Sequence, residues 1–163
     1  MNKLNFGCGS DIKEGWDNFD KKDFDFNVFP YPIENETYDY IYSRCVLEHL
    51  NNPLRVIEEL IRISKLNGII EIVVPHINNA NESCGNLQHR SYFSEQSFIG
   101  IEAWFPNVKI VSIKLEPTKI GKFFPKFIRK TISLFIGYIV TKIKVKLKVI
   151  RIKNETKIKN SNF

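Results

Sequence analysis

Residues 4–10 read Leu-Asn-Phe-Gly-Cys-Gly-Ser, a short apolar run that leads directly into a Gly-x-Gly turn. Residues 16–20, Trp-Asp-Asn-Phe-Asp, predict a second strand with an acid at its end. In an open parallel sheet, ligands lie across the carboxyl ends of the strands, glycines let the backbone approach the ligand, and an acid can accept hydrogen bonds from ribose hydroxyls. The two stretches together are typical of a nucleoside-binding crevice.

Two further motifs follow in order. Asp25-Phe26-Asn27 comes first, and residues 38–50 then read Tyr-Asp-Tyr-Ile-Tyr-Ser-Arg-Cys-Val-Leu-Glu-His-Leu. With these motifs the chain resembles class I S-adenosylmethionine-dependent methyltransferases, in particular the small type 11-like ones. The resemblance covers about residues 3–76, and a weaker match at 89–93 extends it to about residue 114. It implies an α/β, Rossmann-like open sheet that is mostly parallel with an antiparallel last strand, helices on both faces, and S-adenosylmethionine as cofactor.

The resemblance also assigns cofactor-binding roles. Asp20 would bind the ribose hydroxyls, and the turn after the first strand would cradle the methionine part through backbone groups. The segment after the second strand would meet the adenine, and the end of the 38–42 strand would border the methionine. The residues implied are Asn5, Gly7, Cys8, Gly9, Asp20, Asp25, Phe26, Asn27, Ser43 and Arg44.

The chain has three histidines, His49, His76 and His89. If the acceptor is a hydroxyl, a base must take its proton, and histidine is the natural base near neutral pH. His49 belongs to the Glu-His of the family motif, and His89 belongs to the weaker late match. All three are candidate catalytic residues, with the ordering of a loop by a hydrogen bond as the alternative role of each. Glu48 is expected only to cap or pair.

Composition favours one compact domain over residues 1–163, since 43% of the residues are hydrophobic. The three cysteines, Cys8, Cys45 and Cys84, have no metal-ligand spacing, so we expect no metal site and a reducing cytoplasm. An ordinary secretory signal and a spanning helix of ~20 apolar residues are not expected.

The hydrophobic pattern predicts strands at 4–6, 16–20, 24–26, 38–42, 69–74, 108–115 and 142–150. Residues 11–15 leave room for hardly more than one helical turn between the first two strands. A helix is expected from Pro53, capped by Asn52 and followed by Gly68, and a short helix capped by Ser94 runs to about residue 103.

Charge divides the chain. Residues 1–116 hold 11 Lys/Arg against 17 Asp/Glu, whereas residues 117–163 hold 13 against 1. Residues 116–141 are expected to form a basic amphipathic helical insertion between the last two strands, on the same edge as the cofactor crevice. From Ile120 onward aromatic and aliphatic residues, among them Phe123 and Phe127, recur at helical spacing between lysines. Such a helix can lie in a membrane interface or pack on its own domain or on a second subunit.

These observations predict an S-adenosylmethionine-dependent methyltransferase that acts on a small-molecule or glycan acceptor, with a glycan or lipid-linked sugar as first choice. The alternative is a noncatalytic methyltransferase-like module that docks to a membrane or partner through its basic third. Peripheral membrane contact through residues 117–150 and a homodimer are alternatives for its partners. Nucleic acid is disfavoured, because no recognisable binding motif accompanies the charge.

Overall fold

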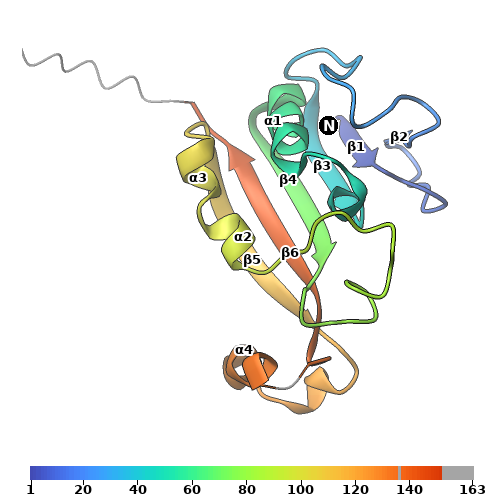
Figure 1. Ribbon diagram of the computed structural model, residues 1–163. Coiled ribbons are helices and arrows are strands. Elements are labelled where there is room, and N and C mark those ends of the chain that lie inside the picture. The colour runs from blue at the N-terminus through green and yellow to red at the C-terminus, as the bar shows by residue number, and fades with distance from the viewer. Residues whose placement is uncertain (136, 152–163) are drawn as a thin grey trace, which may run out of the picture.

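The computed structural model describes residues 1–135 and 137–151, apart from the side chains of residues 130 and 133–135. A six-stranded sheet with the order β2-β1-β3-β4-β6-β5 forms the centre of the molecule (Figure 1). Strands β1 to β4 are parallel, and β6 is antiparallel to both β4 and β5. The strands are β1 Lys3–Phe6, β2 Asp17–Phe19, β3 Tyr38–Arg44, β4 Ser64–Pro75, β5 Val108–Pro117 and β6 Val140–Val149. The predicted α/β, Rossmann-like class is confirmed.

Helical segments occupy the later connections. They are η1 Leu47–His49, α1 Pro53–Ile63, α2 Gln96–Ile99, α3 Ile101–Trp104, η2 Gly121–Phe123 and α4 Lys126–Phe135. Asn52 caps α1 as expected, because its side chain accepts from the Arg55 N–H at 3.1 Å. No helix in the described part of the chain is long and apolar enough to cross a membrane.

The hydrophobic core lies between the sheet and α1 to α3, which share the viewer's face of the sheet in Figure 1. Ile70, Ile72 and Val74 alternate along β4 and are fully buried against this layer, together with Val56 and Leu60 of α1. The sequence analysis expected helices on both faces, but the connection between β1 and β2 has no helix, as its length indicated.

The opposite face of the sheet carries polar and aromatic side chains. Glu71, which is 5% exposed, accepts from the Tyr40 hydroxyl at 2.5 Å and pairs with Lys146 at 2.8 Å and Lys144 at 3.3 Å. Burial works to raise the pKa of Glu71, but hydrogen bonds from the lysines and Tyr40 hold it below its usual value. These side chains give this face its own polar network.

Four expected elements differ in detail from the structure. Residues 24–26 form no strand, because the rings of Phe24 and Phe26 pack on each other at 5.1 Å and on Tyr31 instead of extending the sheet. Helix α1 ends at Ile63 and not near Gly68, since the Ser64 hydroxyl donates to the Leu60 carbonyl at 2.7 Å and the chain turns directly into β4.

The short helix expected from Ser94 is two pieces, α2 and α3, which break at Gly100, and α2 begins without a side-chain cap. The expected insertion helix is likewise divided into η2 and α4, with Pro125 between them. Because β5 runs parallel to β4, α4 leaves the sheet at the same edge as the carboxyl ends of β1, β3 and β4 (Figure 1).

Candidate active site

The turn after β1 is held to the end of β2. The N–H groups of Gly7 and Cys8 both donate to the Phe19 carbonyl, at 2.8 and 3.0 Å. Gly7 has φ +73, and a Cβ there would lie 2.2 Å from Cγ2 of Val46. Gly9 has φ +51, and a Cβ there would meet no atom within 4 Å. Two of the backbone donors predicted to cradle the cofactor therefore serve the fold, and Gly9 provides the open approach.

Asn5 supports this turn from below. Its side-chain N–H₂ donates to the Asp11 carbonyl at 2.6 Å and to Oδ1 of Asn18 at 3.0 Å. Asn18 in turn holds Lys13 and Trp16 through its amide. The short 11–16 connection is therefore ordered by side-chain amides where relatives of this fold would use a helix.

A cavity of about 350 Å³ opens beside this turn. It continues into a shallower hollow of about 630 Å³, and Lys21, Phe26, His49 and Leu50 line both. The two volumes fall in the range usual for small-molecule sites. The first is lined by Gly7, Gly9, Asp20, Lys21, Phe26, Cys45, Val46, His49, Leu50 and Gln88, and the second adds Lys22, Asp25 and Asn27.

Six of the ten predicted cofactor-binding residues line these hollows, whereas Asn5, Cys8, Ser43 and Arg44 do not. Ser43 is 1% exposed, and its hydroxyl has no hydrogen-bond partner in the described structure. Arg44 is exposed, and its side chain hydrogen-bonds Tyr42. Cys8 is buried between the glycines, as expected from its size.

Two acids at the rim are positioned by the loop that carries them. The Asp20 N–H donates to Asp23 at 2.7 Å, and Oδ1 of Asp20 accepts from the Lys21 N–H at 2.8 Å. Oδ1 of Asp25 accepts from the Asn27 N–H at 2.8 Å. Each acid is bonded through one carboxylate oxygen in these contacts, and the other oxygen can receive a ligand donor.

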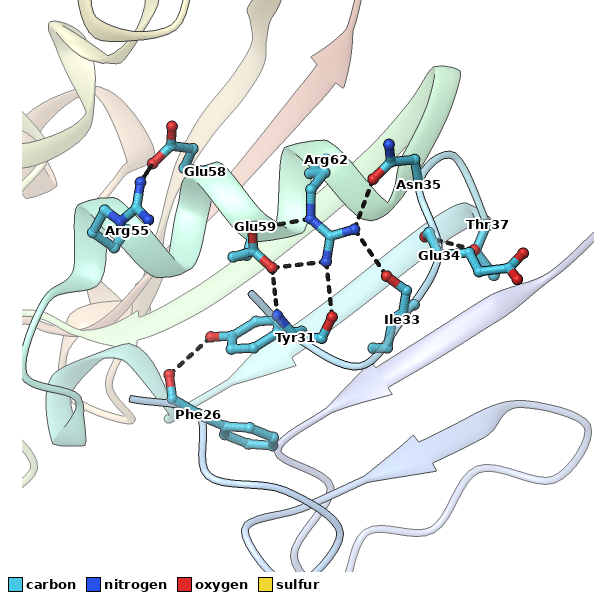
Figure 2. Close-up of polar contacts among 10 residues, drawn as sticks. All are labelled: Phe26, Tyr31, Ile33, Glu34, Asn35, Thr37, Arg55, Glu58, Glu59 and Arg62. Carbon is cyan, nitrogen blue, oxygen red and sulfur yellow. Dashed lines mark hydrogen bonds and ion pairs between the residues drawn. The ribbon is translucent and has the colours of Figure 1, made fainter. Parts of the chain in front are cut away.

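The aromatic wall of the cavity is anchored to α1 (Figure 2). Phe26 stacks on Phe6 with 4.0 Å between ring centroids, and its carbonyl accepts from the Tyr31 hydroxyl at 2.9 Å. The Tyr31 N–H donates to Glu59 of α1 at 2.7 Å, and Arg62 donates to Glu59 at 2.8 Å and to the Tyr31 carbonyl at 3.1 Å. Burial works to raise the pKa of Glu59, but Arg62 and the Tyr31 N–H keep it below its usual value.

The structure brings two of the three histidines together. His49 lines the cavity, and the centroids of its ring and the His89 ring are 4.6 Å apart. Burial lowers the pKa of His49, and His89 adds to this effect, which favours the neutral form of the ring. His76 lies elsewhere: it is 3% exposed, its Nε2 is 3.0 Å from Oε2 of Glu95, and its Nδ1 accepts from the Asn78 N–H. Both of its ring nitrogens are used to order the loop after β4.

Sequence reasoning missed the side chains that complete the wall. Cys45, Val46, Leu50 and Gln88 line the cavity, and Glu48 lies behind His49 with 1% of its surface exposed. Burial raises the pKa of Glu48 to about 7. Glu48 and Val46 belong to the quoted 38–50 motif, but period and composition alone cannot show that a turn after β3 brings them to the crevice.

S-adenosylmethionine, which the sequence resemblance implies, fits these residues. The space at Gly9 would be filled by any Cβ, the Asp20 carboxylate can accept from two hydroxyls, and Phe26 offers an aromatic surface for a base. The fit rests on this cradle, because it combines an open backbone approach with an acid and an aromatic ring in one cavity.

Comparisons with known proteins identify the family and the fold of this chain. The methyltransferase domain family matches residues 3–105. No curated protein matches the sequence. The YcgJ protein from Bacillus subtilis is similar in structure, with 11% identity, 92% of this chain and 92% of that chain covered, and a TM-score of 0.62. An S-adenosylmethionine-dependent methyltransferase from Mesorhizobium loti is 8% identical, with 90% of each chain covered and a TM-score of 0.61.

A third similar structure is the complex of the Haloferax volcanii Trm112 methyltransferase activator with a methyltransferase. It is 10% identical, covers 92% of this chain and 83% of that chain, and has a TM-score of 0.62. At these identities the solved structures establish the fold, and the family match over residues 3–105 establishes the kinship. The chain therefore belongs to the methyltransferase domain family, and S-adenosylmethionine is its cofactor.

Proposed function

We propose that the protein transfers the methyl group of S-adenosylmethionine to a hydroxyl oxygen of a glycan or a lipid-linked sugar. The observation that carries this proposal is the cavity that Gly9, Asp20, Phe26 and His49 line together. The first three residues offer what a nucleoside cofactor needs, and His49 adds an imidazole whose ring lies against that of His89.

The sulfonium of the cofactor supplies an already activated methyl group, so the protein mainly has to hold donor and nucleophile in line and exclude water. In this proposal Asp20 accepts from the ribose hydroxyls, Gly9 admits the methionine part, and Phe26 with Asp25 and Asn27 holds the adenine. Leu50 and Val46 form the apolar part of the wall that keeps water from the reacting atoms.

The proton of the acceptor hydroxyl leaves at the His49 end of the cavity. His49 can receive it because burial lowers the pKa of the ring and so favours the neutral form, which has a nitrogen lone pair available. His89 lies against His49 and holds its own position through Nδ1, which is 2.7 Å from the Ser83 carbonyl oxygen. His76 has no part in this step, since Glu95 and Asn78 occupy its ring nitrogens.

A large, phosphate-bearing acceptor is favoured by the surroundings of the cavity. Lys21 lines both hollows and Lys22 lines the second, so positive charge borders the entrance. On the same sheet edge, α4 and η2 expose Phe123 (88%) and Phe127 (83%) among Lys122, Lys126 and other basic residues. Exposed aromatics beside lysines are typical of a segment that contacts a lipid interface.

This surface also supports the second candidate function, a noncatalytic module that docks to an anionic membrane through residues 117–150. Sedimentation with vesicles tests whether this surface binds lipid. If it binds lipid, the intact chain sediments with vesicles that contain anionic lipid, and Phe123→Ser with Phe127→Ser remains in the supernatant. A matched control, Val111→Ser, removes an exposed apolar side chain from β5 and should sediment like the intact chain.

Partner binding and location are further parts of the proposal. The similar Haloferax volcanii methyltransferase is bound to an activator protein, so an activator or a second copy of this chain could cover the cavity here. We place the protein in the cytoplasm, at the membrane surface when it meets a lipid-linked acceptor. The thiols of Cys8, Cys45 and Cys84 are all free, as a reducing compartment requires.

Two experiments test the proposed function. Calorimetry with S-adenosylmethionine and S-adenosylhomocysteine should give binding that Asp20→Ala abolishes and Asp11→Ala, an exposed acid outside the cavity, leaves intact. Transfer of a radiolabelled methyl group is then measured with lipid-linked oligosaccharides, free oligosaccharides and small hydroxylated metabolites. Cofactor binding without transfer to any saccharide would refute the acceptor class, and absence of cofactor binding would leave the docking module as the function.

A further inference from the structure

Three metal-ligating side chains meet beside the cavity. Glu48 and His49 lie on η1, His89 comes from the loop after β4, and one donor atom from each lies within 4.8 Å of the others. The backbone fixes this meeting, because the Glu48 carbonyl accepts from the Arg90 N–H at 2.6 Å and from the Ser91 N–H at 3.2 Å. These two hydrogen bonds hold the segment that carries His89 against η1.

Burial of the Glu48 carboxyl is poorly compensated. It is 1% exposed, and neither carboxyl oxygen has a hydrogen-bond partner of good geometry in the described structure. The groups that counteract its burial are its own backbone N–H and the Cys45 thiol, which is only a weak donor. Lys142, whose charge also reaches Glu48, is itself ion-paired with Glu82. A buried carboxyl with so little compensation is costly and rare in native proteins, so its position calls for a ligand.

Both histidines are oriented as metal ligands usually are. Nδ1 of His89 is 2.7 Å from the Ser83 carbonyl oxygen, and the His49 ring hydrogen-bonds the backbone of Gln88. In each ring, a nitrogen that donates to a carbonyl leaves the other nitrogen with a lone pair. Such outer hydrogen bonds fix the tautomer and the ring orientation of metal-binding histidines.

We propose that Glu48, His49 and His89 bind a divalent transition cation of the zinc class. Two imidazoles and one carboxylate suit Zn²⁺ or Fe²⁺ far better than Mg²⁺, which prefers oxygen ligands and retains its waters. Ligand bonds of about 2.1 Å place two donors at most about 4.2 Å apart, which is close to the 4.8 Å within which the three donor atoms lie. Three protein ligands leave a coordination position open, and His49, one of the three, lines the cavity.

The existence of the metal site is inferred from the cluster alone. Its role in catalysis rests on the proposed function. At the open position the cation binds the acceptor hydroxyl and lowers its pKa, so that its proton passes to solvent. The oxygen lone pair then forms the bond to the methyl carbon, and the carbon–sulfur bond breaks with its electron pair left on sulfur. The products are the methyl ether and S-adenosylhomocysteine. His49 and His89 then act as ligands, and the cation takes over the activation of the hydroxyl.

The test is metal titration of the intact, chelator-treated chain, without cofactor or acceptor. Calorimetry with Zn²⁺ should show one ion per chain, and Co²⁺ should give the visible absorption of a low-coordinate nitrogen and oxygen site. Glu48→Gln, His49→Asn and His89→Asn should each weaken Zn²⁺ binding by at least about 100-fold. His76→Asn is the matched control and should bind as the intact chain does. Because Cys84 is exposed, every titration is repeated with Cys84→Ser, and the site should persist.

Folding is checked separately. Without metal, Glu48→Gln should melt no lower than the intact chain, since it removes a buried charge that has no partner, and Zn²⁺ should raise the melting temperature of the intact chain alone. Absence of stoichiometric Zn²⁺ binding, or equal loss of binding in His76→Asn, would overturn the metal site. Two assays keep the proposals distinct. Methyl transfer that proceeds in the presence of chelator refutes the cation's role. Failure of the metal-free protein to bind the cofactor in calorimetry refutes the proposed function and leaves the metal site standing.

Discussion

Alanine substitutions at Gly7 and Gly15 measure how tightly the turn after β1 is packed. Both have positive φ, +73 and +71, so alanine at either position costs about 1–2 kcal/mol of backbone strain. They differ in surroundings: a Cβ at Gly15 meets nothing within 4 Å, but at Gly7 it would lie 2.2 Å from Cγ2 of Val46. Overpacking of this kind adds about 1–3 kcal/mol. Gly7→Ala should therefore lower the free energy of unfolding by about 2–5 kcal/mol, and Gly15→Ala by about 1–2.

The assay is urea and thermal unfolding followed by circular dichroism. Each kcal/mol corresponds to about 2–4 °C in melting temperature for a chain of this size. Because Val46 causes the overlap, Val46→Ala should rescue part of the loss, and the double variant should be more stable than additivity predicts by about 1–3 kcal/mol. Equal losses for Gly7→Ala and Gly15→Ala, or an additive double variant, would refute the packing argument.

Two further predictions concern the supports of the site, and a third concerns the opposite face of the sheet. Tyr31→Phe leaves the buried Phe26 carbonyl without its hydroxyl donor and should destabilise the chain by about 1–3 kcal/mol in urea unfolding; unchanged stability would mean that water replaces the hydroxyl. The pKa of Glu59 is lowered, so its contribution is complete above the ordinary value of 4.5 and is lost as pH falls through the lowered value. Melting curves between pH 3 and 7 should therefore lose stability at the acid end, and Glu59→Gln should flatten that loss; parallel curves would contradict the assignment. Glu71→Gln breaks the pair with Lys146 on the opposite face and should cost about 1–3 kcal/mol without changing cofactor affinity in calorimetry.

The features that could be predicted from the sequence depend on hydrophobic alternation, on the positions of glycines and on the order of the motifs. The apolar runs of β1 and β4 appear as buried strands, and the residues expected to alternate along β6 form a strand that is buried on one face. The cavity lies at the carboxyl ends of β1 and β3, where Gly9 and Asp20 were expected. These features can be predicted from the local sequence pattern, because a parallel strand and the turn after it are formed by consecutive residues.

What the sequence could not show depends on tertiary contacts. Phe24 and Phe26 have strong strand propensity, but ring packing with Tyr31 satisfies them without any sheet pairing. His49 and His89 are equivalent candidates to His76 in the sequence, and only the fold separates them, since His76 finds Glu95 in the loop after β4. The isolation of Glu48 is likewise invisible from its position in the motif.

The two outermost strands of the sheet bear on how this protein behaves at high concentration. A free edge presents unpaired backbone groups on which a strand from another copy can add, and long edges are the usual starting points of aggregation. Here β2 has only three residues, and the ten-residue β5 shifts register twice, carries the outward lysines Lys109 and Lys114, and ends in Pro117. Kinks, charge and a missing N–H all oppose strand addition. The sheet can thus present a long β5 strand at its edge and still resist polymerisation through its backbone.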